Sequence, residues 1–161
     1  MRKNLILLLC LASAVFSAEF DASKINSYLK ECNQNRASGC FYVGIAYFLG
    51  DGLNKDDKKA LDFFKKANKL EPNNAFYIST IAHVYYYRYK TDDKAALLDD
   101  AVKLFTAACK LKDAASCYEL GEIYNYENDK RDYSKAASYY KQSCNLQNMD
   151  GCLKLRNLKN K

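Results

Sequence analysis

The cysteines are the residues whose type and spacing most clearly indicate chemistry. The chain contains seven of them, and six fall into three pairs with members eight residues apart: Cys32 and Cys40, Cys109 and Cys117, Cys144 and Cys152. Such thiols can ligate a metal ion or oxidise to disulfides. Zinc clusters use cysteines about two to four residues apart, usually with histidines nearby, and His83 is the only histidine of this chain. We therefore expect disulfides and no metal site.

The N-terminal stretch predicts export. Met1-Arg2-Lys3 is a short basic region, residues 5–11 are apolar, and small residues follow, which is the pattern of a secretory signal peptide. The apolar run is too short to span a membrane. We expect residues 1–17 to be removed by cleavage after Ser17, with Ala14 as the alternative position, so Cys10 is lost. The remaining chain is predicted to be periplasmic or secreted, without stable membrane insertion.

Six cysteines then remain in an oxidising compartment, where disulfides form and persist. Each pair spans the end of one predicted helix and the start of the next. The predicted pairing is therefore local, between Cys32 and Cys40, Cys109 and Cys117, and Cys144 and Cys152.

The charge of the remaining chain, residues 18–161, is small and scattered. Two of the 25 basic side chains lie in the signal peptide, which leaves 23 against 19 acidic side chains and a net charge of +4. The lysine-rich stretches at 58–59, 65–66 and 154–161 are interpreted as solvated faces, because nucleic-acid binding needs a clustered basic surface. We expect one domain with a modest core and no nucleic-acid partner.

A helical repeat accounts for most of the chain. The predicted first helix of each copy carries an apolar residue, a small residue, two variable positions and a tyrosine, at residues 43–47, 81–85 and 120–124. The predicted second helix carries a small residue, an aromatic and a small residue: Ala60, Phe64, Ala67; Ala101, Phe105, Ala108; Ala136, Tyr140, Ser143. Spacings of three and four put these on one face, where small residues let two helices approach and the aromatic fills the space. Three repeats are predicted, at residues 37–70, 74–111 and 114–146.

Half-repeats are expected at both ends, where a solenoid must cover its apolar surface. Residues 22–34 match a second helix alone. Residues 149–159 match a first helix alone, in which Arg156 replaces the small residue and leaves no surface for a further helix. The junction at 70–74 has no cysteines and carries Pro72, which ends a helix, followed by asparagines that can cap the next one.

Several of these motifs resemble a known repeat family. They are Leu120-Gly121 with Tyr124, Lys135-Ala136 followed by Tyr140 and Cys144, and the cysteines eight residues apart. Over residues 22–158 the chain resembles Sel1-like repeats, in particular the Helicobacter-type cysteine-rich secreted proteins, and its first junction resembles the related tetratricopeptide repeat. The resemblance implies an all-α fold, a right-handed α/α superhelical solenoid of helix pairs stapled by disulfides.

The resemblance also implies an activity, since those cysteine-rich proteins have been described as penicillin-binding with weak β-lactamase activity. A serine β-lactamase needs Ser-x-x-Lys together with Ser-Asp-Asn and Lys-Thr-Gly elements. Residues 27–30 and 138–141 fit the first pattern, but neither of the other elements is present. β-Lactamase activity is therefore an alternative that rests on the resemblance alone, and no catalytic residue or cofactor is predicted.

A binding scaffold is the function that the residues favour. In tetratricopeptide-like solenoids the first helices line a concave groove. Transfer of those groove positions predicts ligand-binding residues at Phe41, Phe48, His83, Tyr86, Tyr87, Tyr118, Glu122, Asn125 and Tyr126. Tyrosines offer rigid apolar area with a hydroxyl group, which suits a protein or peptide partner. A peptidoglycan fragment and a β-lactam are further candidates. In the alternative interpretation these tyrosines are core between repeats, and His83 is a structural side chain.

Overall fold

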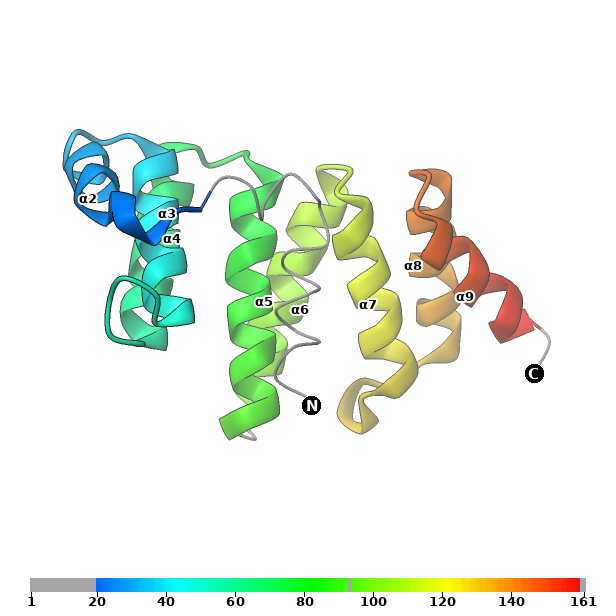
Figure 1. The fold of residues 1–161 in the computed structure, drawn as a ribbon. Coiled ribbons are helices and arrows are strands. Elements are labelled where there is room, and N and C mark those ends of the chain that lie inside the picture. Colours follow the sequence, from blue (N-terminus) through cyan, green and yellow to red (C-terminus); the bar gives the residue numbers. More distant parts are fainter. Residues whose placement is uncertain (1–19, 93, 160–161) are drawn as a thin grey trace.

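The computed structural model describes residues 20–92 and 94–159 (Figure 1). The predicted signal peptide lies outside the described residues. The described part is all-helical, with eight α-helices and two short 3₁₀ helices. In chain order they are η1 (Ala22–Lys24), α2 (Ile25–Asn33), α3 (Ala37–Leu49), α4 (Asp57–Leu70), α5 (Ala75–Asp92), α6 (Ala95–Lys110), α7 (Ala114–Tyr126), η2 (Asn128–Lys130), α8 (Tyr133–Asn145) and α9 (Met149–Lys159).

The α-helices form pairs that stack side by side into a solenoid (Figure 1). Helix α3 pairs with α4, α5 with α6, and α7 with α8, while α2 and α9 pack at the two ends. The predicted all-α solenoid is therefore confirmed. The middle pair is the longest, with 18 and 16 residues in α5 and α6 against 13 and 14 in α3 and α4. The longer sequence of the second repeat thus extends its helices.

Aspartates fix where several helices begin. Asp113 accepts a hydrogen bond from the backbone N–H of Ser116 at 2.9 Å, at the start of α7. Asp132 accepts one from the backbone N–H of Lys135 at 2.9 Å, at the start of α8, and Asp56 caps α4 in the same way. Each carboxylate satisfies a donor that the first turn leaves unpaired and interacts favourably with the helix dipole. The cap fixes where α7 begins, and the start of the helix determines on which of its faces each tyrosine lies.

The three disulfides close turns of one backbone shape. They join Cys32 to Cys40, Cys109 to Cys117 and Cys144 to Cys152, with Cα atoms 4.4, 4.9 and 4.6 Å apart. This is the predicted local pairing. The third residue after the first cysteine of each pair has a left-handed backbone, with φ of 58° at Asn35, 68° at Lys112 and 67° at Gln147. A residue of this conformation ends a helix and turns the chain into the next one.

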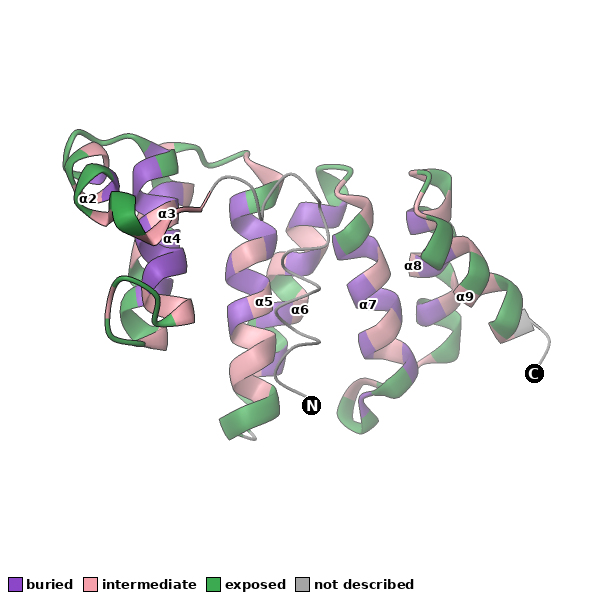
Figure 2. Cartoon of the chain, in the orientation of Figure 1, coloured by how far each residue is buried: buried purple, intermediate pink, exposed green. Residues whose placement is uncertain are grey.

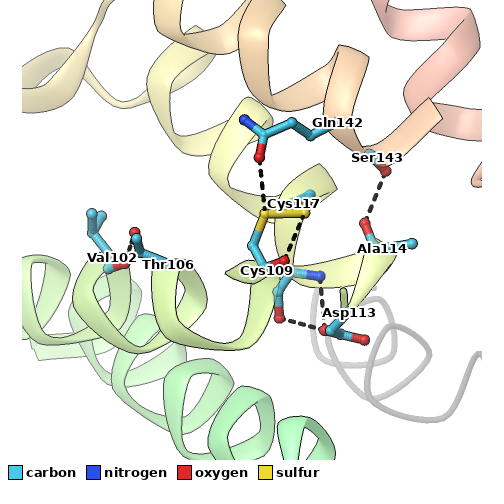
Figure 3. The surroundings of a disulfide bond; sticks show 9 residues. Val102, Thr106, Cys109, Asp113, Ala114, Cys117, Gln142 and Ser143 are labelled. Atoms are coloured by element: carbon cyan, nitrogen blue, oxygen red, sulfur yellow. Dashed lines mark hydrogen bonds between the residues drawn. A yellow bond between two sulfur atoms is a disulfide. The ribbon is translucent and has the colours of Figure 1, made fainter. Parts of the chain in front are cut away.

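The next repeat covers the middle disulfide (Figure 3). The Oε1 atom of Gln142 on α8 lies 3.7 Å from Sγ of Cys109. The buried Ser143 donates its hydroxyl to the carbonyl oxygen of Ala114 at 2.8 Å. Helix α8 therefore packs directly onto the turn between α6 and α7.

The small and aromatic residues of the repeat pattern pack against one another. Phe64, Phe105 and Tyr140 are almost completely buried between paired helices. A Cβ atom on Gly121 would lie 2.5 Å from the Tyr140 ring, too close for any side chain. Figure 2 shows buried residues in every helix pair and exposed residues at most turns. The core thus lies between first and second helices, in one cluster of buried residues from α2 to α5 and a second from α5 to α7.

Candidate functional site

The first helices of the pairs, α3, α5 and α7, follow one another along the solenoid, and α9 continues the row (Figure 1). Side chains from successive members of this row contact each other. We call the surface that they form the first-helix face. It comprises Phe48, Lys55, Tyr86, Tyr87, Tyr89, Lys90, Tyr118, Glu119, Glu122, Tyr126, Glu127 and Lys154.

An aromatic pair with a cation above it joins α3 to α5. The rings of Phe48 and Tyr87 meet edge to face with centroids 5.6 Å apart. The Lys55 ammonium lies 5.7 Å from the Phe48 centroid and 5.3 Å from the Tyr87 centroid. Because a cation is attracted to the negative faces of aromatic rings, this contact helps to hold both rings in place.

A carboxylate holds the tyrosines of α5 against the end of α7. Glu127, just after α7 and 8% exposed, accepts hydrogen bonds from the hydroxyls of Tyr86 at 2.5 Å and Tyr89 at 3.3 Å, and from the Lys90 ammonium at 2.9 Å. Burial acts to raise the pKa of Glu127, but these donors outweigh it and lower the pKa. Burial and the hydrogen bond to Glu127 raise the pKa of Tyr86 well above its ordinary value. Glu127 is therefore ionised and Tyr86 neutral near pH 7.

A second carboxylate joins α7, α8 and α9. Glu122 accepts a hydrogen bond from the Tyr140 hydroxyl at 2.5 Å and pairs with the Lys154 ammonium at 2.8 Å. The same ammonium lies 5.9 Å from the Tyr118 centroid and 5.1 Å from the Tyr126 centroid. Burial acts to lower the pKa of Lys154, but the hydrogen bond and charge of Glu122 raise it. This end of the face therefore carries two tyrosines around a permanently charged lysine.

Glu119 differs from the other carboxylates of the first-helix face. It is 7% exposed, and no hydrogen bond to it is present within residues 20–92 and 94–159. Burial, followed by the charges of Glu122 and Asp113, raises the pKa of Glu119 to about 7, although Lys154 acts in the opposite direction. After burial and Glu127, its charge also contributes to the raised pKa of Tyr86 on α5.

His83 is half-buried and packs on the core. Its ring meets the Phe105 ring edge to face with centroids 4.8 Å apart. Burial lowers the pKa of His83 to about 4, so the imidazole is neutral near pH 7. This environment is that of a structural histidine rather than of an exposed general base.

The structure separates the predicted ligand-binding residues into two groups. Phe41 and Asn125 are buried, at 3% and 7% exposure. Phe41 packs on Phe64 with centroids 5.3 Å apart, and Asn125 donates to the Tyr140 hydroxyl at 3.4 Å. We therefore leave Phe41 and His83 out of the binding surface, whereas Asn125 lies at its edge, where it lines a small pocket beside Tyr126. The others lie on the first-helix face: Phe48, Tyr86, Tyr87, Tyr118, Glu122 and Tyr126.

Sequence reasoning missed Glu119 and Glu127. Glu119 occupies the repeat position that holds Tyr42 in the first copy and Thr80 in the second. A carboxylate at that position, next to the fully buried Leu120, is a signal that could have been noticed. Glu127 has no such signal, because its partners Tyr86 and Lys90 belong to the preceding repeat.

A small pocket lies at the end of the first-helix face. It has a volume of about 240 Å³ and is lined by Asn125, Tyr126, Lys154, Asn157 and Leu158. Its walls come from α7 and α9 only. The pocket therefore suits one side chain of a larger ligand better than a whole small molecule.

The two Ser-x-x-Lys matches do not form a catalytic arrangement in the described part. Ser27 is exposed on α2, and its hydroxyl donates to Glu31 at 3.4 Å. Ser138 is exposed on α8, a second helix outside the first-helix face. β-Lactamase activity thus gains no support from the geometry of either serine.

Comparison with known proteins identifies the repeat. The Sel1 repeat family model matches residues 37–71 and 114–148. The chain is similar to a Sel1 repeat protein from Oxalobacter formigenes, with 21% identity and a TM-score of 0.68 over 83% of this chain and 53% of that one. It is also similar to c5321, a protective antigen present in uropathogenic Escherichia coli strains displaying an SLR fold, with 15% identity and a TM-score of 0.69 over 96% of this chain and 33% of that one. The chain spans about half the length of the first structure and a third of the second. No curated protein matches the sequence.

The stacked helix pairs and their cysteine-stapled turns define an α-helical repeat scaffold. The chain carries two Sel1 repeats, at residues 37–71 and 114–148, within a solenoid whose fold is that of solved Sel1 repeat structures. Its three disulfides indicate a location outside the cytoplasm, because such bonds persist in oxidising compartments. None of the helices in the described part has the length and apolar character needed to cross a membrane.

Proposed function

We propose that the protein is an exported scaffold that binds a protein or a peptide through its first-helix face. Sel1 repeats generally mediate protein–protein interactions. The observation that carries the proposal is a row of aromatic side chains on α3, α5 and α7 that are not fully buried, of which Phe48 and Tyr86 also pack against the core: Phe48, Tyr86, Tyr87, Tyr118 and Tyr126.

The environment of these rings suits recognition. Lys55 lies over the Phe48 and Tyr87 rings, Glu127 accepts the Tyr86 hydroxyl, and Lys154 lies near the Tyr118 and Tyr126 rings. A partner that packs on rings already held in place loses less conformational freedom on binding. Tyrosines beside charged groups also provide both apolar area and polar handles, as at protein interfaces.

The ligand that fits this face best is an extended or helical polypeptide segment. The aromatic side chains extend along three successive first helices, and the pocket beside Tyr126 accommodates a side chain rather than a whole molecule. No comparison favours a peptidoglycan fragment or a β-lactam. The disulfides support the proposed location in the periplasm or outside the cell.

Site-directed photo-crosslinking tests the proposal. A benzophenone amino acid replaces Tyr87, on the first-helix face, or Tyr133, an exposed tyrosine on α8. The oxidised protein is then irradiated with the envelope fraction and the medium of the cells that make it. We expect discrete adducts from position 87 that position 133 does not give.

The same adducts from both positions, or none from position 87, would contradict the proposal. Pre-incubation with excess unlabelled wild-type protein provides a further control, since it removes specific adducts and leaves non-specific ones unchanged.

A further inference from the structure

The carboxylates near α7 differ in whether the protein itself satisfies them. Glu127 accepts three donors, and Glu122 accepts two. Asp113 accepts the backbone N–H of Ser116 as a helix cap. In the described part of the chain, Glu119 has no such donor, although it is more than nine-tenths buried.

The lysines at this end of the first-helix face pair with other carboxylates, and Lys154 offsets the charge of Glu119 only in part. Lys90 pairs with Glu127 at 2.9 Å, and Lys154 pairs with Glu122 at 2.8 Å. An ionised carboxylate that is buried without a partner is costly, and the cost is removed when a cation reaches it. Burial, followed by the charges of Glu122 and Asp113, raises the pKa of Glu119.

The side chains around Glu119 are those that recognise an organic cation. Tyr118 directly precedes Glu119 on α7. Tyr86 on α5 lies at the end of α7 through its hydrogen bond to Glu127, and the charge of Glu119 adds, after burial and Glu127, to the raised pKa of its phenol. Tyrosine rings attract ammonium and guanidinium groups, and a carboxylate forms charge-assisted hydrogen bonds with them. An anionic or purely apolar ligand group would leave Glu119 unpaired.

We propose that Glu119 receives a lysine or arginine side chain of the bound polypeptide, beside Tyr86 and Tyr118 on the first-helix face. This inference rests on the proposed function and specifies the chemistry of the partner. The cation provides a hydrogen-bond donor to a carboxylate that accepts none from the described residues and is only 7% exposed. The first-helix face thereby discriminates between polypeptides by charge as well as by aromatic contact.

The test uses a random peptide library displayed on phage, selected in parallel at pH 8 on oxidised wild-type protein, Glu119→Gln and Asp62→Asn. Asp62 is an exposed carboxylate on α4, so its variant removes the same charge away from the first-helix face. We expect lysine or arginine to be enriched several-fold at one position on wild type and on Asp62→Asn. The enrichment should fall to the library frequency on Glu119→Gln.

A selected peptide then allows the interaction between Glu119 and the cationic residue of the peptide to be measured directly. Replacement of its cationic residue by norleucine should weaken binding to wild type at least about tenfold and binding to Glu119→Gln less than about twofold. Equal losses on both proteins would overturn the inference. A thermal melt of Glu119→Gln at pH 8, expected at or above that of wild type, excludes unfolding as the cause.

Other outcomes separate the inference from the proposed function. If peptides are selected that require Tyr126 but carry no enriched cation, the inference fails and the proposed function stands. If no selected peptide requires Tyr126, both fail. Displacement of the peptide by free spermidine at the peptide's own concentration, lost in Glu119→Gln, would assign the site to a polyamine and overturn the polypeptide partner.

Discussion

The Tyr86 hydroxyl donates to the Glu127 carboxylate at 2.5 Å, across 41 residues of sequence. The bond joins α5 of the second helix pair to the segment after α7 of the third. Tyr86 is therefore both part of the first-helix face and a link between repeats. Its replacement tests stability as well as binding.

Loss of the Tyr86 hydroxyl should destabilise the protein. Tyr86→Phe leaves the buried Glu127 short of one donor, which we expect to cost about 1–3 kcal/mol of unfolding free energy. Urea unfolding at pH 7 measures this. Tyr87→Phe is the matched control, because the Tyr87 hydroxyl makes no hydrogen bond within the described residues, and its effect should stay below about 0.5 kcal/mol. Equal effects of the two variants on the unfolding free energy would show that the hydrogen bond to Glu127 does not stabilise the contact between repeats.

Aromatic residues of the core and of the first-helix face should respond differently to truncation. Phe105 is fully buried, so Phe105→Ala should cost about 3–5 kcal/mol through lost transfer free energy and a cavity. Tyr126 is 55% exposed, and Tyr126→Ala should cost about 0.5 kcal/mol or less. Thermal melts of both variants decide the matter. If Tyr126→Ala melts as low as Phe105→Ala, Tyr126 is core and the binding surface is misplaced.

The architecture could be predicted because it repeats. The contact between Gly121 and Tyr140 recurs between Gly44 and Phe64, so one periodic pattern specifies several helix contacts. The local disulfides follow similarly from cysteines placed at the two ends of each predicted turn. Because the pattern occurs several times in one chain, a single sequence is enough to recognise it and to predict the fold.

Features that occur once could not be predicted in this way. The hydrogen bond from Tyr86 to Glu127 depends on how two helix pairs stack, which no local pattern encodes. The left-handed backbone does recur, at Asn35, Lys112 and Gln147, but the residue types at 112 and 147 do not indicate it, since glycine or asparagine is usual there. The burial of Phe41 and Asn125 likewise depends on packing between repeats, and transferred groove positions do not include that packing.

The backbone of Lys112 gives a prediction of its own. With φ of 68°, the lysine bears the steric cost of a left-handed conformation. Lys112→Gly should therefore stabilise the protein by up to about 1 kcal/mol. Lys110→Gly, two residues earlier in the last turn of α6, should instead destabilise it by about 0.5–1 kcal/mol. Chemical unfolding of both variants tests this, and a loss of stability in both would contradict the assigned turn.

Glu119 should make stability depend on pH. Burial raises its pKa from 4.5 to about 7, so the folded state binds the proton more tightly than the unfolded state. Its contribution is fully present below about pH 4.5 and is lost as pH rises through 7. Glu119→Gln should therefore exceed wild type in unfolding free energy by up to about 3 kcal/mol at pH 8, and match it near pH 4.

The measured quantity is the difference in unfolding free energy between wild type and Glu119→Gln. This difference is needed because His83 changes the stability of both proteins with pH in the opposite direction. Its pKa is lowered from 6.5 to about 4 by burial, so its contribution is present above pH 6.5 and is lost as pH falls through 4. The two effects partly cancel in wild type. Denaturant unfolding of wild type, Glu119→Gln and Asp62→Asn at pH 4, 6 and 8 isolates Glu119. A difference that does not change with pH would contradict its assigned environment.

The most direct test of the account is the affinity of one selected peptide for two tyrosine variants, measured by titration calorimetry on the oxidised protein. Tyr126 on α7 and Tyr133 on α8 are matched in type and exposure, at 55% and 56%. We expect Tyr126→Ala to weaken binding at least about tenfold and Tyr133→Ala to leave it unchanged. Equal affinities of the two variants would contradict a binding surface on the first-helix face.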